Sequence, residues 1–380
     1  MQIEQRHWSA NQGWKTLSAN PASGRAQLAL VFGDVATLSD EEALAAVRRA
    51  YPDAILAGCS TAGEIHGVAV SDDSLVVTAV HLEHGRCTLA RVTLSDYESN
   101  RAAAEALAQQ LPTEDLVHVL VFSEGLHVNG TELAEGLHEA LPKGVTATGG
   151  LSGDGNRFGR TVVCANEVGR SGEVVAVGLH GSRLQVGYGS LGGWDPFGPE
   201  RVITKAEGSV LYELDGRPAL DLYEEYLGEH ASGLPATGLL FPLMIRAPES
   251  EQAGLVRTLV AIDEQERSVT FVGEMAQGHH ARLMKANFDR LIDGALGAAQ
   301  TALAGLREPG AELALLVSCV GRRLVLKQRT EEELEAVREI VGPETTMTGF
   351  YSYGEICPAG VAADCELHNQ TMTVTTLREV

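Results

Sequence analysis

The chain has few positive charges: 29 Lys and Arg stand against 51 Asp and Glu in 380 residues, a formal net charge of −22. This excess of negative charge repels nucleic-acid phosphates and anionic membranes, so it argues against both as partners. The chain also lacks any run near the ~20 apolar residues that span a bilayer, and its first residues contain no apolar signal core. We therefore expect a cytoplasmic protein without membrane insertion.

Cysteine pairs and catalytic motifs are missing as well. The six cysteines form no C-x-x-C pair and no zinc-finger spacing with histidine, which is typical of a reducing compartment. No P-loop, H-E-x-x-H, EF-hand or G-x-S-x-G pattern occurs. Residues 187–192 fit the glycine spacing of a dinucleotide site, but no helical pattern follows them, which favours a turn. We therefore expect a protein that is not an enzyme.

What the chain does contain is a pattern that occurs three times. An apolar strand pattern begins at Leu28, Leu116 and Leu313, and each is followed by a helical stretch and a second short apolar run. Each unit then ends in a glycine turn, at residues 58–65, 149–154 and 349–356. Because the apolar runs do not alternate strictly with polar residues, we expect both faces of the sheets to be covered.

Each helix pattern is preceded by a candidate capping box. A cap side chain accepts a hydrogen bond from a free amide of the first helical turn, and a Glu three residues later bonds back to the cap. The three pairs are Ser39 with Glu42, Asn129 with Glu132, and Thr330 with Glu333.

The glycine turns also carry acids at matching positions, Glu64, Asp154 and Glu355. Two interpretations stay open: each acid points into a shared cleft, or it caps its own turn. β-branched runs follow each turn and predict antiparallel hairpins. We therefore predict an α/β fold with mixed sheets covered by helices, built from duplicated strand–helix–strand units, in two closely packed domains that divide near residue 215.

The chain resembles the FIST family of bacterial sensory proteins. The resemblance rests on the order and number of several motifs: GCSTAGEI, TATGGLSGDG, VGYGSLGGWDPFGPER, LYELDGRPALDLYEEYLG, SCVGRR, GFYSYGEI and CELHNQTMT. It implies a FIST N-terminal domain at residues 24–214 and a FIST C-terminal domain at residues 215–380. It also implies binding of a small ligand, with an amino acid or similar metabolite as the candidate. Because no output segment is fused, signalling would pass to a separate partner, a histidine kinase or another signalling protein.

Polar and aromatic residues gather around the third turn, where Tyr351 and Tyr353 replace the small Ser60 and Ala62 of the first. Aromatic rings with hydroxyl tips suit a pocket that needs an apolar wall and a donor, and an Arg can hold a carboxylate through two hydrogen bonds. The carboxyl ends of neighbouring strands are where α/β sheets hold ligands. The predicted ligand-binding residues are Arg322, Tyr351, Tyr353, Glu355, His368 and Asn369.

Two alternatives remain beside the ligand sensor, and self-association is left open. Some proteins that this chain resembles bind haem, sense nitric oxide and act with a histidine kinase and cyclic-di-GMP signalling. His368 is the candidate iron ligand for that alternative, since a neutral imidazole nitrogen binds haem iron. The second alternative is a hydrolase-like enzyme that uses the polar third turn.

Overall fold

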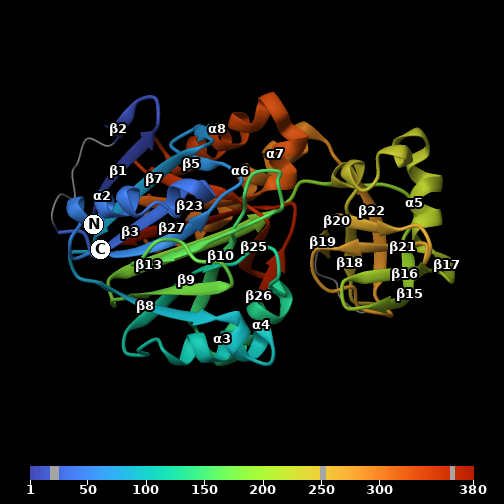
Figure 1. Ribbon diagram of the computed structural model, residues 1–380, viewed down its shortest axis with the longest axis horizontal. Helices are drawn as coiled ribbons and strands as arrows, with labels where there is room; N and C mark the ends of the chain where they lie inside the picture. Colours follow the sequence, from blue (N-terminus) through green and yellow to red (C-terminus); the bar gives the residue numbers. More distant parts are fainter. Residues whose placement is uncertain (18–24, 249–253, 360–363) are drawn as a thin grey trace.

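The computed structural model describes residues 1–17, 25–248, 254–359 and 364–380. These residues form two bodies that lie side by side (Figure 1). The larger body contains three six-stranded sheets, and the smaller contains one nine-stranded sheet. Within these ranges, the search for a helix long and apolar enough to cross a membrane finds none.

Each predicted unit is a pair of parallel strands joined through a helix, as expected for a crossover connection. All residues of the first strands of units one and three are buried, which explains why their sequences do not alternate. The parallel pairs are β3 (Leu28–Gly33) with β4 (Ile55–Ser60), β9 (Leu116–Ser123) with β10 (Thr146–Leu151), and β23 (Leu313–Cys319) with β24 (Thr346–Ser352). The connecting helices are α2 (Glu41–Ala50), α4 (Gly130–Ala140) and α8 (Thr330–Val341).

Two antiparallel strands extend each sheet on the side of the unit's first strand. The inner ones are β7 (Ser74–His81), β12 (Glu173–His180) and β27 (Met372–Glu379), and the outer ones are β1 (Gln2–Ser9), β8 (Arg86–Thr93) and β13 (Leu184–Leu191). At the edge of the first sheet, β2 (Gly13–Thr16) pairs with β1. The sheets are therefore mixed, and the predicted α/β class is confirmed.

The hairpins that follow the glycine turns do not join the sheet of their own unit. After the first turn, β5 (Glu64–His66) and β6 (Ala69–Ser71) pair beside β24 in the third sheet. After the second turn, β11 (Val163–Ala165) pairs with β4 in the first sheet. After the third turn, β25 (Gly354–Ala359) and β26 (Asp364–His368) pair beside β10 in the second sheet. This exchange runs once around the molecule and ties the three units into a closed ring.

Glycine opens each turn because the neighbouring strand leaves no room for a side chain. A Cβ atom at Gly58, Gly149 or Gly349 would lie 1.9, 1.9 or 1.8 Å from a carbonyl oxygen of the adjacent strand. At the centre of the ring, Phe32, Phe122 and Phe350 contact one another with ring centroids 4.9 to 6.2 Å apart. This aromatic contact joins the cores of the three sheets.

Helices cover the outer faces of the sheets. α3 (Asn100–Gln109) packs against α4, and α6 (Phe288–Ala304) packs against α8. Gly187 and Gly189 of β13 lie against α6, where a Cβ atom would be 1.9 and 2.4 Å from helix carbonyl oxygens, so this glycine pattern serves packing. The remaining helices of the larger body are α1 (Val35–Leu38), η1 (Leu94–Asp96), α7 (Val320–Leu326) and η4 (Lys327–Arg329).

Only one of the three predicted capping boxes forms at a helix start. Asn129 accepts from the backbone N–H of Glu132, as predicted. The prediction for Ser39 is wrong, because Asp40 caps α2 and Ser39 ends the short α1. The prediction for Thr330 is also wrong: α8 has no side-chain cap, and Glu333 is buried in the core with Arg322.

The smaller body is inserted between β13 and α6. Its core packs α5 (Ala219–Leu227) on the nine-stranded sheet. Residue 215 lies between two strands of this body, and the predicted division of the chain there stays a prediction. The strands are β14 (Asp195–Pro196), β15 (Arg201–Glu207), β16 (Val210–Leu214), β17 (Arg217–Pro218), β18 (Leu243–Arg246), β19 (Leu255–Arg257), β20 (Leu259–Asp263), β21 (Ser268–Phe271) and β22 (His280–Lys285), with η2 (Gly228–Gly233) and η3 (Ala236–Leu240).

Candidate functional site

The three glycine turns meet where the parallel strand pairs end. Their backbones form a ring of equivalent hydrogen bonds, each running from one turn to the next. The N–H of Ala62 donates to the carbonyl of Tyr351 at 2.7 Å, that of Gly153 to Ser60 at 2.9 Å, and that of Tyr353 to Leu151 at 3.1 Å. The carboxyl ends of all three units are thereby fixed around one approximate threefold axis.

The acids of the first and third turns are alike in their hydrogen bonds and in their burial. Glu64 accepts from the hydroxyls of Thr61 at 2.5 Å and Ser74 at 2.6 Å. Glu355 accepts from the hydroxyls of Ser352 at 2.6 Å and Thr371 at 2.9 Å. Burial raises the pKa of each carboxyl to about 8, because an apolar surrounding disfavours the charged form.

The acid of the second turn behaves differently. Asp154 accepts from the backbone N–H groups of Phe158, Gly159 and Arg160 at 2.8 to 2.9 Å and from the hydroxyl of Tyr353. Burial raises its pKa, but these hydrogen bonds outweigh burial and hold the pKa below its usual value. Asp154 therefore stays charged and organises the loop that follows the second turn.

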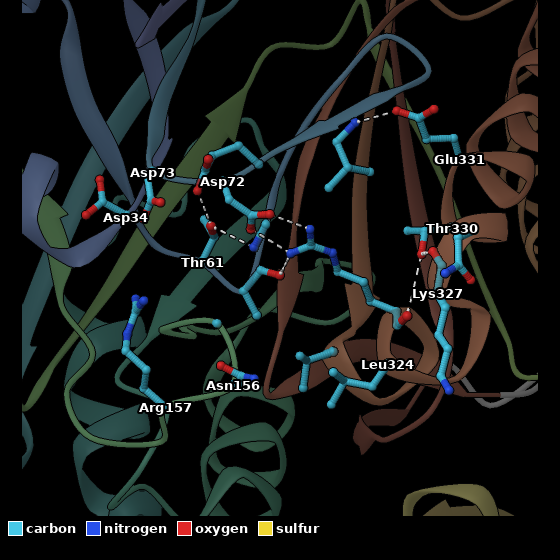
Figure 2. A pocket seen from close by; sticks show the side chains of 18 residues that line it. Asp34, Thr61, Asp72, Asp73, Asn156, Arg157, Leu324, Lys327, Thr330 and Glu331 are labelled. Atoms are coloured by element: carbon cyan, nitrogen blue, oxygen red, sulfur yellow. Dashed lines mark hydrogen bonds and ion pairs between the residues drawn. The ribbon is translucent and has the colours of Figure 1, made fainter. Parts of the chain in front are cut away.

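A cavity of about 750 Å³ opens beside the first turn. All three units contribute to its walls (Figure 2). The first unit supplies the turn and its acid, the second supplies the loop at 155–157, and the third supplies α7, η4 and the start of α8. The polar and charged lining residues are Asp34, Thr61, Glu64, Asp72, Asp73, Asn156, Arg157, Arg323, Lys327, Gln328, Thr330 and Glu331.

An ion pair between two units forms one wall of the cavity. Arg323 donates to both carboxylate oxygens of Asp72 at 2.7 Å, and to the carbonyl of Ala62 at 2.7 Å. Its guanidinium also lies over the ring of Tyr351, 5.6 Å from the ring centroid. Such a two-pronged pair fixes both position and direction, so it holds the hairpin of the first unit against α7 of the third.

Three other charged side chains in the cavity have no charged partner among the described residues. Arg157, Lys327 and Asp73 are exposed, and among the described residues no ion pair or hydrogen bond engages their side-chain charges. Figure 2 shows Asp34 and Asp73 on one side of the cavity and Lys327 on the other. Asp34 itself caps α1, since it accepts from the N–H groups of Ala36 and Thr37. The cavity thus presents free charges of both signs on facing walls.

Of the residues predicted from the third unit, Arg322 and Tyr351 lie together in the core. Arg322 is fully buried, pairs with Glu333 at 2.8 Å, and donates to the carbonyls of Gly192 and Leu291. Tyr351 donates to the same Glu333 at 2.6 Å. Neither lines a cavity that the structure describes, and their role in ligand binding stays a prediction.

The other four predicted residues spread over separate contacts. Glu355 bonds within its own turn, and Asn369 donates to the carbonyl of His368. Tyr353 lines a second cavity, between the two bodies. The Nε2 of His368 lies 3.1 Å from the carbonyl oxygen of Cys357, and burial lowers the pKa of His368 to about 4.

Haem ligation by His368 does not fit this arrangement. The described cavities do not include His368 in their linings, and its Nε2 is committed to a backbone carbonyl in the core. Within the described ranges, no group of three or more His, Cys, Asp or Glu could hold a metal ion.

Sequence reasoning missed Arg157, Lys327 and Asp73. Asp73 and Arg157 stand in loops and Lys327 in η4, each in a different unit, and nothing in their local sequence indicates that they meet. A partial signal existed at Glu64, whose position the repeat relates to Glu355. The SCVGRR motif also pointed to this region, but it is Arg323 that faces the cavity and Arg322 that faces the core.

Comparison with known proteins gives matches along most of the chain. The model of the FIST N domain matches residues 27–217, and that of the FIST C domain matches residues 219–358. Two uncharacterised proteins of Mycobacterium tuberculosis, from strains CDC 1551 and H37Rv, are each 25% identical over 93% of this chain and 91% of their own length. A cyanuric acid hydrolase from A. caulinodans aligns at 11% identity over 78% of this chain and 99% of its own, with a TM-score of 0.18. A structural likeness that weak carries no argument.

Proposed function

Because this chain belongs to the FIST family, we propose that it is a cytoplasmic sensory protein that binds an amino acid or a similar zwitterionic metabolite and signals to a separate partner. FIST domains are associated with sensory signal transduction and small-ligand binding. The ligand and its place in this chain are our proposal, and the place is the cavity beside the first glycine turn.

The observation that carries the proposal is the pair of facing free charges in that cavity. A zwitterion lying across it directs its ammonium group to Asp73 and its carboxylate to Lys327. Arg157 adds a second free cation, which favours a ligand whose side chain is polar or acidic. The volume of about 750 Å³ lies within the 300–1,000 Å³ usual for small-ligand sites.

The walls of the cavity suggest how binding reaches a partner. The ligand contacts a segment of each of the three units, and around this cavity the turn ring and the Arg323–Asp72 pair also connect these units. A ligand that contacts both Asp73 and Lys327 shifts the conformational equilibrium toward the arrangement in which these segments lie closest together, because it binds that arrangement more tightly. We propose that a histidine kinase or another signalling protein recognises the altered surface.

We also propose that the site is not catalytic. Thr61 is the hydroxyl that lines the cavity beside the turn acid, and it donates its proton to Glu64. A hydroxyl nucleophile needs a base that can accept its proton. Glu64 already accepts hydrogen bonds on both oxygens, from Thr61 and Ser74, and burial raises its pKa to about 8, which disfavours the charged form that a base must present at neutral pH.

Titration calorimetry with the twenty amino acids tests the proposal. At least one should bind the wild type, and the variant Asp73→Asn/Lys327→Met should lose that binding. The matched control Asp53→Asn/Lys143→Met changes two exposed charges away from the cavity and should bind as the wild type does. The proposal is wrong if no amino acid binds, or if the cavity variant and the control bind equally well.

A further inference from the structure

A second cavity lies between the two bodies and is built differently from the first. It holds about 610 Å³ and, among the described residues, shares only Val320 with the lining of the cavity beside the first turn. The larger body contributes one part of its apolar wall and the smaller body the other. The apolar lining residues are Leu126, Val128, Leu151, Phe158, Leu239, Val260, Phe271, Val272, Val320, Tyr353 and Leu367.

An aromatic stack forms part of this wall, and one of its two residues has a strained backbone conformation. The ring of Phe158 stacks on Tyr353 with centroids 4.6 Å apart and planes 19° apart. Phe158 remains 49% exposed, and its backbone φ of 50° is one that bulky residues rarely adopt. The loop keeps this conformation because Asp154 binds three successive N–H groups. Strain of this kind is typical of residues that contact a ligand.

The polar groups around the cavity favour a positive charge. Among the described lining residues there is no Lys or Arg, while two carboxylates are present. Glu132 is engaged by Asn129 and by the N–H of Asn100. Glu274 is exposed, and its carboxylate has no hydrogen bond or ion pair among the described residues, while its backbone carbonyl accepts from the buried Arg257. Thr258 is 6% exposed, and its hydroxyl has no hydrogen-bond partner in the described structure.

We infer that this cavity is a second ligand site, for an aromatic amine, whose ring stacks on Phe158 and whose ammonium pairs with Glu274. The Thr258 hydroxyl is available to a polar substituent of the ring. Because the walls come from both bodies, the bound ligand fixes the smaller body against the larger one. The second site therefore differs from the first both in its ligand and in the movement it controls.

The test compares three probes by titration calorimetry: tryptamine, indole-3-acetate and 2-cyclohexylethylamine. Tryptamine carries both the ring and the positive charge, whereas indole-3-acetate reverses the charge and 2-cyclohexylethylamine lacks the aromatic ring. Tryptamine should bind most tightly. If either of the other two binds as tightly, or if tryptamine does not bind at millimolar concentration, the inference is overturned.

Variants separate the two contacts. Phe158→Asn removes the ring while Asn tolerates the positive φ, so the fold is kept and tryptamine affinity should fall about threefold to tenfold. Glu274→Gln should weaken tryptamine about twofold to fivefold. The controls are Phe288→Ala, which removes another half-exposed ring, and Glu264→Gln, an exposed acid outside the cavity. Unchanged affinity in both Phe158→Asn and Glu274→Gln overturns the inference.

Tryptamine binding in the second cavity should be independent of amino-acid binding in the first. Phe158→Asn and Glu274→Gln should leave amino-acid binding unchanged, and Asp73→Asn/Lys327→Met should leave tryptamine binding unchanged. Loss of tryptamine binding in that charge variant would show that the probe occupies the first cavity, which also overturns the inference.

Discussion

The buried ion pair of Arg322 is the contact in the third unit whose contribution to the free energy of unfolding can be tested most directly. Its guanidinium donates to Glu333 through two nitrogens, at 3.0 and 2.8 Å, and to the carbonyls of Gly192 and Leu291 at 2.5 and 2.6 Å. Both charged side chains are fully buried. Replacing Arg322 by Met fills a similar volume but leaves a buried carboxylate without its cation.

We expect Arg322→Met to lower the free energy of unfolding by about 3–5 kcal/mol, the usual cost of breaking a buried ion pair from one side. Glu333 keeps hydrogen bonds from Ser318 and Tyr351, which do not neutralise its charge. The double variant Arg322→Met/Glu333→Leu removes both charges, so it should be less destabilised than the sum of its single variants.

Urea unfolding followed by far-UV circular dichroism measures these differences. Trp194, whose indole N–H donates to Gln370 beside the pair, reports locally by fluorescence in a background in which Trp8 and Trp14 are replaced by Phe. The control is Arg329→Met, which breaks an exposed pair with Asp289 and Glu332 and should change little. If Arg322→Met is no more destabilising than Arg329→Met, the buried pair does not stabilise the fold as argued, and ligand binding becomes the better account of Arg322.

Three further outcomes follow from the turns and caps. Burial raises the pKa of Glu355 from its ordinary value near 4.5 to about 8, so its stabilising contribution is present below pH 4.5 and is lost as pH rises to 8; the decline of unfolding free energy with pH, measured by urea unfolding, should be shallower in Glu355→Gln. Gly349→Ala should prevent folding or destabilise severely, because its Cβ meets a carbonyl at 1.8 Å. Gly342→Ala meets nothing within 4 Å and should cost about 1–3 kcal/mol, because its φ of 87° and ψ of 164° lie in a region that is essentially restricted to glycine; thermal unfolding compares the two variants. Asp40→Ala should cost about 0.5–2 kcal/mol while Ser39→Ala costs little, and the reverse order in urea unfolding would contradict the observed cap of α2.

The local features of the units could be predicted from sequence because each depends on residues within a short stretch of the chain. Each unit can be identified by an apolar run, a stretch with helical periodicity, and a glycine whose Cβ would clash with the next strand. The exchange of hairpins between units could not be predicted in this way. It depends on pairings such as β5 with β24, whose residues lie nearly 300 positions apart in the printed sequence, and nothing in the residues 64–66 specifies that partner.

The capping boxes show why an identical pattern can have different outcomes. Asn129 and Glu132 stand at a half-buried helix start, where the local hydrogen bond is available and no buried cation competes for the glutamate. Glu333 has the same spacing from Thr330, but it faces a buried arginine eleven residues earlier in the chain. A charge-assisted bond in the core is stronger than a cap in water, so the tertiary contact decides the role of the glutamate. The buried pair with Glu333 also explains why Arg322, which the sequence predicted at the ligand, lies in the core. Its neighbour Arg323 lines the cavity instead.

The threefold repeat builds the scaffold, and departures from it create the cavities. The first and third turns each keep a buried glutamate that accepts from a hydroxyl of its own turn and from one of the following strand region, which leaves the two turns structurally equivalent. The second turn is one residue shorter, and Asp154 turns outward to hold the loop that carries Arg157 and Phe158. Arg157 thereby reaches the first cavity and Phe158 the second. A substitution of Asp154 by Asn weakens three charge-assisted bonds at once, so it should impair the binding of both proposed ligands although it contacts neither cavity as a lining residue.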